Sequence, residues 1–186
     1  MGLRFIVGLG NPGPRYERTR HNIGFRLIEF MAEGAGGWKD FEGMGRYLRR
    51  DELILAEPMT FMNESGRFVG ALGRFFKIPP SDTLVCFDDV ALPFGRLRLR
   101  PSGSSGGQNG MKSILECLGT EDVPRLRVGV GPQPEFMDSA DFVLSRFSGE
   151  EEKSLPQVLG EAASAVETAY REGFQAAMNK FNPARP

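Results

Sequence analysis

The stretch Val7-Gly8-Leu9-Gly10-Asn11-Pro12-Gly13-Pro14 ends an apolar run that begins at Leu3, and Thr19-Arg20-His21-Asn22 follows closely. The apolar run predicts a buried strand, and the glycines and prolines predict a turn that ends it. Open α/β sheets place their ligand sites at the carboxyl ends of their strands. We therefore expect Asn11 and His21, which is the only histidine in the chain, at such an edge.

The same stretch matches the G-x-G-x-x-G pattern of dinucleotide-binding proteins. That pattern needs helical N–H groups that face a pyrophosphate, but the two prolines of the turn lack an N–H group. The helical pattern begins only near Asn22, and Glu29 and Glu33, about 20 positions on, both fall within it. Dinucleotide binding is therefore an alternative that the sequence disfavours.

Length and composition predict one domain over residues 1–186 with a substantial core, since 40% of the residues are hydrophobic and 25% are charged. No apolar run reaches the length of a membrane span, and Arg4 and Gly8 interrupt the short apolar start. Cys86 and Cys117 form no C-x-x-C motif. We expect a cytoplasmic protein with no membrane partner and no metal site.

The net charge of −1 conceals an uneven distribution. Residues 1–131 hold 18 Lys and Arg against 15 Asp and Glu, whereas residues 132–186 hold 5 against 9. Arginine supplies 18 of the cations, and its planar guanidinium binds phosphate in a bidentate manner. Most of these arginines are ordinary surface residues, but a partner that carries phosphate is expected on the first two-thirds of the chain.

Strand and helix patterns alternate along most of the chain. Strands are predicted at 3–7, 46–50, 53–56, 83–87, 96–100 and 125–130, and helices at 23–33 (with Asn22 as N-cap), 65–76, 111–118, 150–170 and 174–181. Residues 101–110 are predicted to form a Ser/Gly loop that is flexible or lies close to a ligand. This order predicts the α/β class: a single domain with a central mixed, largely parallel sheet flanked by helices and a hairpin at one side.

Such a sheet gathers Asn11, Asn63, Asp88 and Asn109 near His21. The sequence has no recognisable nucleophile elbow, and one histidine cannot build a zinc site. A histidine oriented by a carboxylate can activate water, and an asparagine NH₂ group can donate to a developing oxyanion. A lone histidine is more often structural, so these residues alone leave catalysis and a structural role both open.

Several motifs together carry a resemblance that covers nearly the whole chain. They are 7–13, Tyr16, 19–24, 58–66, 88–89 with 92–93, 106–112 and 125–131. In content and order they resemble the bacterial peptidyl-tRNA hydrolase family. The resemblance implies hydrolysis of the ester between a peptide and the 3′-terminal ribose of tRNA, which recycles tRNA from stalled ribosomes. It also implies a single α/β domain, usually monomeric, that needs no metal or cofactor.

The resemblance also implies roles for individual residues. His21 is the general base, Asp88 is its partner, and Asn11 contacts the peptide and separates blocked from free aminoacyl-tRNA. The remaining residues bind the acceptor stem and the 3′ CCA end of tRNA. In that set, Asn63 and Asn109 lie near the ester, Tyr16 and Phe61 line the terminal nucleotide site, Arg100 and Arg127 clamp the 5′ phosphate, and Lys112 belongs to the same surface.

The chain departs from the family pattern at several positions. The loop that usually contains two histidines has Ser105 and Gln108 instead. Phe87 replaces the histidine that often precedes the aspartate, and Ala91 replaces a further aspartate of that motif. Because His21 is the only imidazole, we expect the pH dependence of the rate near neutrality to follow one histidine. A relative that binds RNA and has lost the chemistry is the alternative from another class, because a fold does not imply a function.

Overall fold

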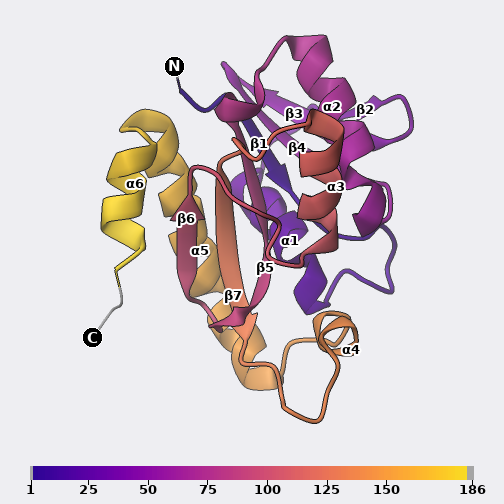
Figure 1. Ribbon diagram of the computed structural model, residues 1–186, viewed down its shortest axis with the longest axis vertical. Coiled ribbons are helices and arrows are strands. Elements are labelled where there is room, and N and C mark those ends of the chain that lie inside the picture. Colours follow the sequence, from indigo (N-terminus) through magenta and orange to yellow (C-terminus); the bar gives the residue numbers. More distant parts are fainter. Residues whose placement is uncertain (1, 184–186) are drawn as a thin grey trace.

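The structure is a computed structural model that describes residues 2–183. Its described residues form one seven-stranded sheet in the order β2-β3-β4-β1-β5-β7-β6 (Figure 1). The strands are β1 (Phe5–Gly8), β2 (Lys39–Phe41), β3 (Gly45–Arg50), β4 (Leu53–Pro58), β5 (Thr83–Pro93), β6 (Leu97–Arg100) and β7 (Arg125–Gly131). The four central strands are parallel, while β2, β3 and β6 are antiparallel to their neighbours. The predicted mixed, largely parallel sheet with a hairpin at one side is confirmed.

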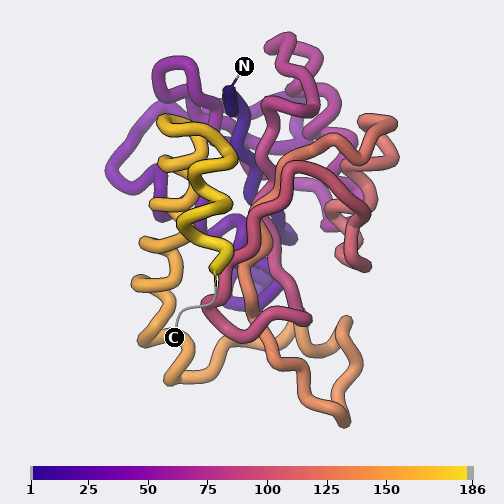
Figure 2. The backbone as a smooth tube through the Cα atoms, turned by 60° about the vertical axis from the view of Figure 1, so that its left-hand side comes forward, coloured from indigo at the N-terminus to yellow at the C-terminus, as the bar shows by residue number. Residues whose placement is uncertain are grey.

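Helices cover both faces of the sheet, because alternate side chains along each central strand enter two separate apolar clusters. One face packs against α1 (Ile23–Met31) and α5 (Gly149–Arg171), and α6 (Phe174–Phe181) lies beside α5 (Figure 2). The other face packs against α2 (Ser65–Phe76) and α3 (Asn109–Leu118). The remaining helical segments are short: α4 (Ser139–Val143), η1 (Arg20–Asn22), η2 (Met62–Glu64) and η3 (Pro80–Asp82).

The structure differs from the predictions at two strands, and Asn22 occupies the predicted N-cap position of α1 without capping it through its side chain. Strand β5 continues past Phe87 to Pro93, because β7 pairs with it along that length. The short strand β2 was not predicted, and its residues pair with β3 as the outer strand of a meander. The side chain of Asn22 makes no capping hydrogen bond to α1, because it is bonded to the backbone of Asn11 instead.

The glycines of the first motif allow helix α1 to approach strand β1 closely. A Cβ atom on Gly8 would lie 2.1 Å from the carbonyl oxygen of Gly24, and one on Gly24 would lie 2.4 Å from the backbone nitrogen of Leu9. The N–H of Phe25 donates to the carbonyl of Leu9 at 3.2 Å across the same contact. This packing accounts for Gly8 of the stretch and for Gly24 of α1 without a bound dinucleotide.

The outer edge of β6 is closed by one side chain from the end of the chain. The N–H of Leu99 donates to Asn182 Oδ1 at 2.7 Å, and Asn182 Nδ2 donates to the carbonyl of Leu99 at 3.0 Å. The carboxamide thereby makes the two hydrogen bonds that a neighbouring strand would make. Among residues 2–183, no helix is long and apolar enough to cross a lipid bilayer.

Candidate active site

A pocket of about 590 Å³ lies beyond the carboxyl end of strand β1 and beside the middle of strand β5. Its walls come from the glycine turn, η1, η2, the loop before α3, and α4. Seven of the predicted site residues line it: Asn11, His21, Phe61, Asn63, Asp88, Asn109 and Arg127. The turn after β1, the middle of β5, η2 and the start of α3 therefore bring together groups that the sequence places far apart.

His21 and Asp88 form a hydrogen-bonded pair at this pocket. His21 Nδ1 lies 2.8 Å from Asp88 Oδ2, and only 12% of the imidazole and 2% of the carboxylate are exposed. An ionised carboxylate can only accept, so Nδ1 is the donor of this bond, and in the neutral imidazole Nε2 then carries the lone pair. The pair can therefore accept a proton from a water molecule in the pocket.

The buried side chain of Asn11 has a fixed orientation. Its Oδ1 accepts from the N–H of Met62 at 2.8 Å, which leaves the NH₂ group available at the pocket. Asn22 holds the backbone of the same residue: Asn22 Oδ1 accepts from the Asn11 N–H, and Asn22 Nδ2 donates to the Asn11 carbonyl, both at 2.9 Å. The NH₂ group of Asn11 is thus a neutral donor at the pocket, and the backbone that carries it is hydrogen-bonded through both its N–H and its carbonyl.

Arg20 attaches the turn that carries His21 to the start of helix α5. Its guanidinium donates to Ser145 Oγ and to Glu151 Oε2, both at 2.7 Å, and to the carbonyl of Arg146. The guanidinium carbon also lies 4.4 Å from the centre of the Phe142 ring. Because Arg20 is buried and directly precedes His21, these contacts attach the backbone next to the imidazole to the segment before α5.

The second carboxylate of the Asp88-Asp89 pair serves a different group. Asp89 Oδ2 lies 2.5 Å from Arg127 Nη2, and Asp89 Oδ1 accepts from the N–H of Ala91 at 2.8 Å. Arg127 also lines a second cavity of about 300 Å³, and Arg100 lies there with it. Successive residues of a strand face opposite ways, so the two aspartates serve different groups.

Arg125, which is 2% exposed, holds the Ser/Gly loop through hydrogen bonds from its guanidinium. Its guanidinium donates to the carbonyls of Val123 at 2.9 Å, Ser104 at 2.6 Å and Glu121 at 3.3 Å. Burial lowers the pKa of this guanidinium, and the nearby cation Arg127 lowers it further. The first half of the loop is therefore anchored to β7.

Two predicted site residues lie outside both cavities. Tyr16 is half-buried beside Arg15, and Lys112 is exposed on the first turn of α3. Conversely, Arg20, Asn22 and Asp89 belong to the site, although the sequence predicted no role for them there. The motif around His21 contained the first two, but their long-range partners were not visible in the sequence.

Within residues 2–183, no group of three or more His, Cys, Asp or Glu side chains could hold a metal ion.

Comparison with known proteins identifies clear relatives. The family model described as peptidyl-tRNA hydrolase matches residues 5–186. The peptidyl-tRNA hydrolase of Elusimicrobium minutum is 49% identical over 97% of this chain and 99% of its own. That of Chloroflexus aggregans is 51% identical over 96% of this chain and 98% of its own. The crystal structure of an Arg119Gln mutant of the enzyme from Acinetobacter baumannii superposes with a TM-score of 0.89, at 32% identity, over 100% of this chain and 97% of its own.

Proposed function

Because this chain belongs to the peptidyl-tRNA hydrolase family, we propose that His21 is the general base of its reaction and that Asp88 supports it. The reaction is hydrolysis of the ester that joins a peptide to tRNA. The observation that carries the proposal is the 2.8 Å hydrogen bond between a buried carboxylate and an imidazole at the wall of the main pocket.

The proposed reaction uses the unprotonated Nε2 of His21. A water molecule attacks the ester carbonyl while Nε2 takes one of its protons, and the carboxylate of Asp88 stabilises the resulting imidazolium. The tetrahedral intermediate then collapses, and Nε2 returns the proton to the departing 3′ oxygen of the ribose. The products are a free carboxylic acid and a free tRNA hydroxyl, so the histidine ends in its starting state.

The three asparagines at the pocket are proposed to recognise the acyl part of the substrate. The NH₂ group of Asn11 suits the carbonyl of a peptide bond, whereas it cannot accept a hydrogen bond from the ammonium group of a free aminoacyl-tRNA. This gives a physical reason for the expected preference for blocked substrates. Asn63 and Asn109 line the same pocket and are proposed to bind next to the ester, with Phe61 and Tyr16 against the terminal nucleotide.

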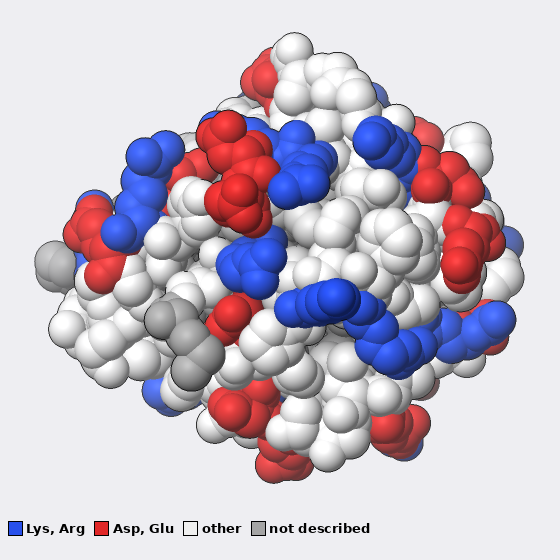
Figure 3. All heavy atoms as spheres, turned by 90° about the horizontal axis from the view of Figure 1, so that it is seen from above, with Lys and Arg blue, Asp and Glu red and all other residues white. Residues whose placement is uncertain are grey.

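The acceptor stem is proposed to lie against the second cavity, with its 5′ phosphate between Arg100 and Arg127. Burial lowers the pKa of the neighbouring Arg98, and the cations Arg100, Arg96 and Arg127 lower it further. Such a concentration of positive charge favours an anionic ligand. The end of the molecule seen from above has Lys and Arg interspersed with Asp and Glu (Figure 3). Lys112 is proposed as a further contact with the acceptor stem.

The decisive experiment measures release of an N-blocked amino acid from N-blocked aminoacyl-tRNA. We expect wild type to cleave this substrate and to spare free aminoacyl-tRNA, and His21→Ala to lose activity by about 10³-fold or more. The drop caused by Asp88→Ala measures how far the carboxylate supports the base. If wild type binds the tRNA with a salt-dependent affinity but does not cleave it, the protein is an RNA-binding relative.

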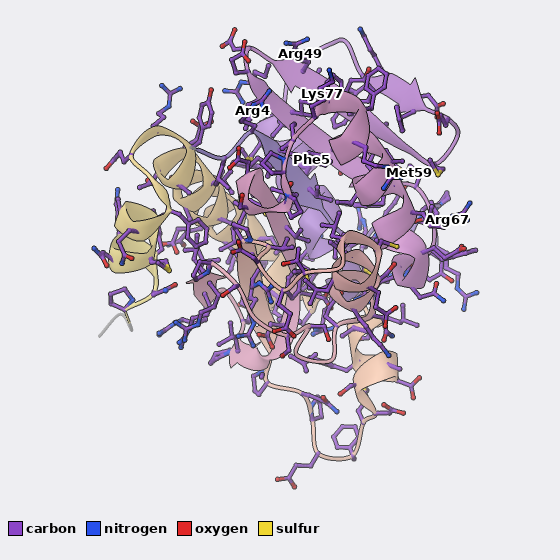
Figure 4. The ribbon with its side chains drawn as sticks, turned by 45° about the horizontal axis from the view of Figure 1, so that its top comes forward. Arg4, Phe5, Arg49, Met59, Arg67 and Lys77 are labelled. Carbon is purple, nitrogen blue, oxygen red and sulfur yellow. The ribbon has the colours of Figure 1, made fainter. Side chains whose placement is uncertain are left out.

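A second experiment tests the phosphate clamp. Arg100→Ala and Arg127→Ala are each expected to raise KM, with kcat little changed, and to reduce the salt dependence of binding by about one counterion. A substrate without the 5′ phosphate should remove the difference from wild type. Arg49→Ala is the control, because this exposed arginine of β3 (Figure 4) lines neither cavity. Equal effects of all three substitutions would refute the clamp.

We further propose that residues 1–186 act as one domain, as a monomer and in the cytoplasm. Support for one domain comes from the single sheet to which the strands of the described residues belong. Ultracentrifugation of the purified protein at micromolar concentration tests the monomer: a sedimentation mass near 20.5 kDa is expected.

A further inference from the structure

Gln108 makes hydrogen bonds with both ends of its side-chain amide at the edge of the main pocket. It is the N-cap residue of α3, and its Oε1 accepts from the N–H of Met111 at 2.7 Å. Its Nε2 lies 3.1 Å from Asp88 Oδ1 and 3.3 Å from Met62 Sδ. A backbone N–H can only donate, so the capping bond assigns Oε1 as the acceptor. Nε2 is therefore the atom that donates to Asp88.

The two oxygens of Asp88 are thus divided between two partners. Oδ2 faces His21 Nδ1 at 2.8 Å, and Oδ1 accepts from Gln108. The carboxylate is 2% exposed, so water cannot easily replace either partner. With Oδ1 held by Gln108, rotation of the carboxylate away from the imidazole would break a buried hydrogen bond.

We propose that Gln108 is a positioning residue for this reaction: it holds the carboxylate of Asp88 toward His21 and links that orientation to the start of helix α3. This inference rests on the proposed roles of His21 and Asp88. The helix that Gln108 caps begins with Asn109, which is proposed to bind the substrate. One amide therefore sets the position of the His21–Asp88 pair relative to Asn109. Gln108 acts through Asp88 and takes no part in proton transfer.

The chemical character of glutamine suits this position. An amide does not titrate, so its NH₂ group remains a donor at every pH at which the protein is folded. The histidine usual at this position in the family pattern would bring a second titratable ring next to Asp88. In this chain the outer partner of the carboxylate is an amide that stays uncharged, and His21 is the only imidazole next to Asp88.

Two substitutions separate positioning from helix capping. Gln108→Ser retains an oxygen that can cap α3 but is too short to reach Asp88. Gln108→Glu retains an acceptor and replaces the donor by a carboxylate, which repels Asp88 when ionised. We expect kcat to fall about tenfold or more for the serine variant and further for the glutamate variant, with KM within about twofold of wild type. Gln175→Ser is the matched control, because Gln175 is exposed on α6 and bonds only to Asn179 among the described contacts.

The single histidine provides a readout that does not depend on catalysis. In untagged protein labelled with ¹⁵N-histidine, the ring signals come from His21 alone. Loss of the donor frees the carboxylate of Asp88 to turn away from the imidazole, so Gln108→Ser should shift these ring signals relative to wild type at the same pH. Gln175→Ser should leave the ring signals unchanged.

The outcomes are distinguishable. A lower kcat together with shifted His21 signals supports the positioning role. Unchanged kcat, with or without a lower Tm, or a lower kcat with His21 signals that superpose on those of wild type, overturns it. If His21→Ala retains the wild-type rate, the proposed general base is wrong, whereas the ring signals still report whether Gln108 acts on the pair.

Discussion

Asn22 and Asn11 are joined by two hydrogen bonds of 2.9 Å, from the side chain of one to the N–H and the carbonyl of the other. The side chain of Asn22 therefore occupies the place of a neighbouring strand beside the glycine turn. Both residues are buried, so neither bond can be replaced by water. The orientation of the Asn11 amide at the pocket depends on this pair.

The first prediction concerns that pair. Asn22→Ala leaves a buried N–H and a buried carbonyl unpaired, so we expect a loss of about 2–4 kcal/mol in the free energy of unfolding and a marked fall in kcat. Urea denaturation and the blocked-substrate assay measure the two effects. Asn179→Ala is the control, because its bond to Gln175 is exposed, and it should change stability by less than about 0.5 kcal/mol. A fully stable Asn22→Ala would contradict the prediction.

Arg20 offers a second prediction. Arg20→Met removes a buried guanidinium and leaves Glu151 and the carbonyl of Arg146 without their partner. We expect a loss of about 3 kcal/mol in stability and a lower kcat, because the turn that carries His21 loses its anchor to α5. Arg26→Met makes the same chemical change at a more exposed pair with Glu152, and about 1 kcal/mol or less is expected there. Equal losses at both positions would show that burial of the anchor has no effect.

The third prediction concerns the contact between α1 and β1. In Gly24→Ala, the new methyl group would lie 2.4 Å from the Leu9 nitrogen and 2.5 Å from the Cys86 carbonyl oxygen. Both are backbone atoms that cannot move independently, so we expect a destabilisation of about 3 kcal/mol or failure to fold. Gly36→Ala has nothing within 4 Å of the new methyl group and should be close to neutral. Thermal unfolding of the two variants side by side provides the comparison.

A fourth prediction follows from Glu57, a carboxyl group with no exposed surface. Burial raises its pKa from 4.5 to about 7, although Arg46 lies 2.6 Å away and opposes the shift. Between these values the folded protein binds a proton that the unfolded chain has released. Stability should therefore fall as pH rises from about 4.5 to about 7 and remain low above that range.

Glu57→Gln tests this pH dependence. The amide has no charge to bury, so the variant should lose much less stability than wild type between pH 5 and pH 8. The expected difference between the two proteins is on the order of 3 kcal/mol at most, since one pKa unit corresponds to about 1.4 kcal/mol. Melting curves across this pH range measure it. If both proteins show the same pH dependence, Glu57 is not the group responsible.

Sequence patterns predicted six of the seven strands, the mixed and largely parallel sheet, and the grouping of polar residues near His21. Hydrophobic periodicity suffices for that, since each central strand has an apolar face toward each helix layer. The sequence did not predict the partners of Asn22 and Arg20. Asn22 immediately precedes a helical pattern, where a local cap is the ordinary expectation, but a long-range bond to Asn11 replaces it. Arg20 bonds to residues more than 120 positions away, and no local pattern specifies such a contact.

The carboxamide of Asn182 that closes the edge of β6 has a consequence for synthesis on the ribosome. Strand β6 ends at residue 100, but its outer partner, Asn182, is added only after about 80 further residues have been synthesised. Until then, the backbone of Leu99 has unpaired groups that can bond to a strand of another nascent chain. A polypeptide that ended just after α6, before residue 182, would contain all seven strands and the helices of both layers but would retain an edge open to aggregation.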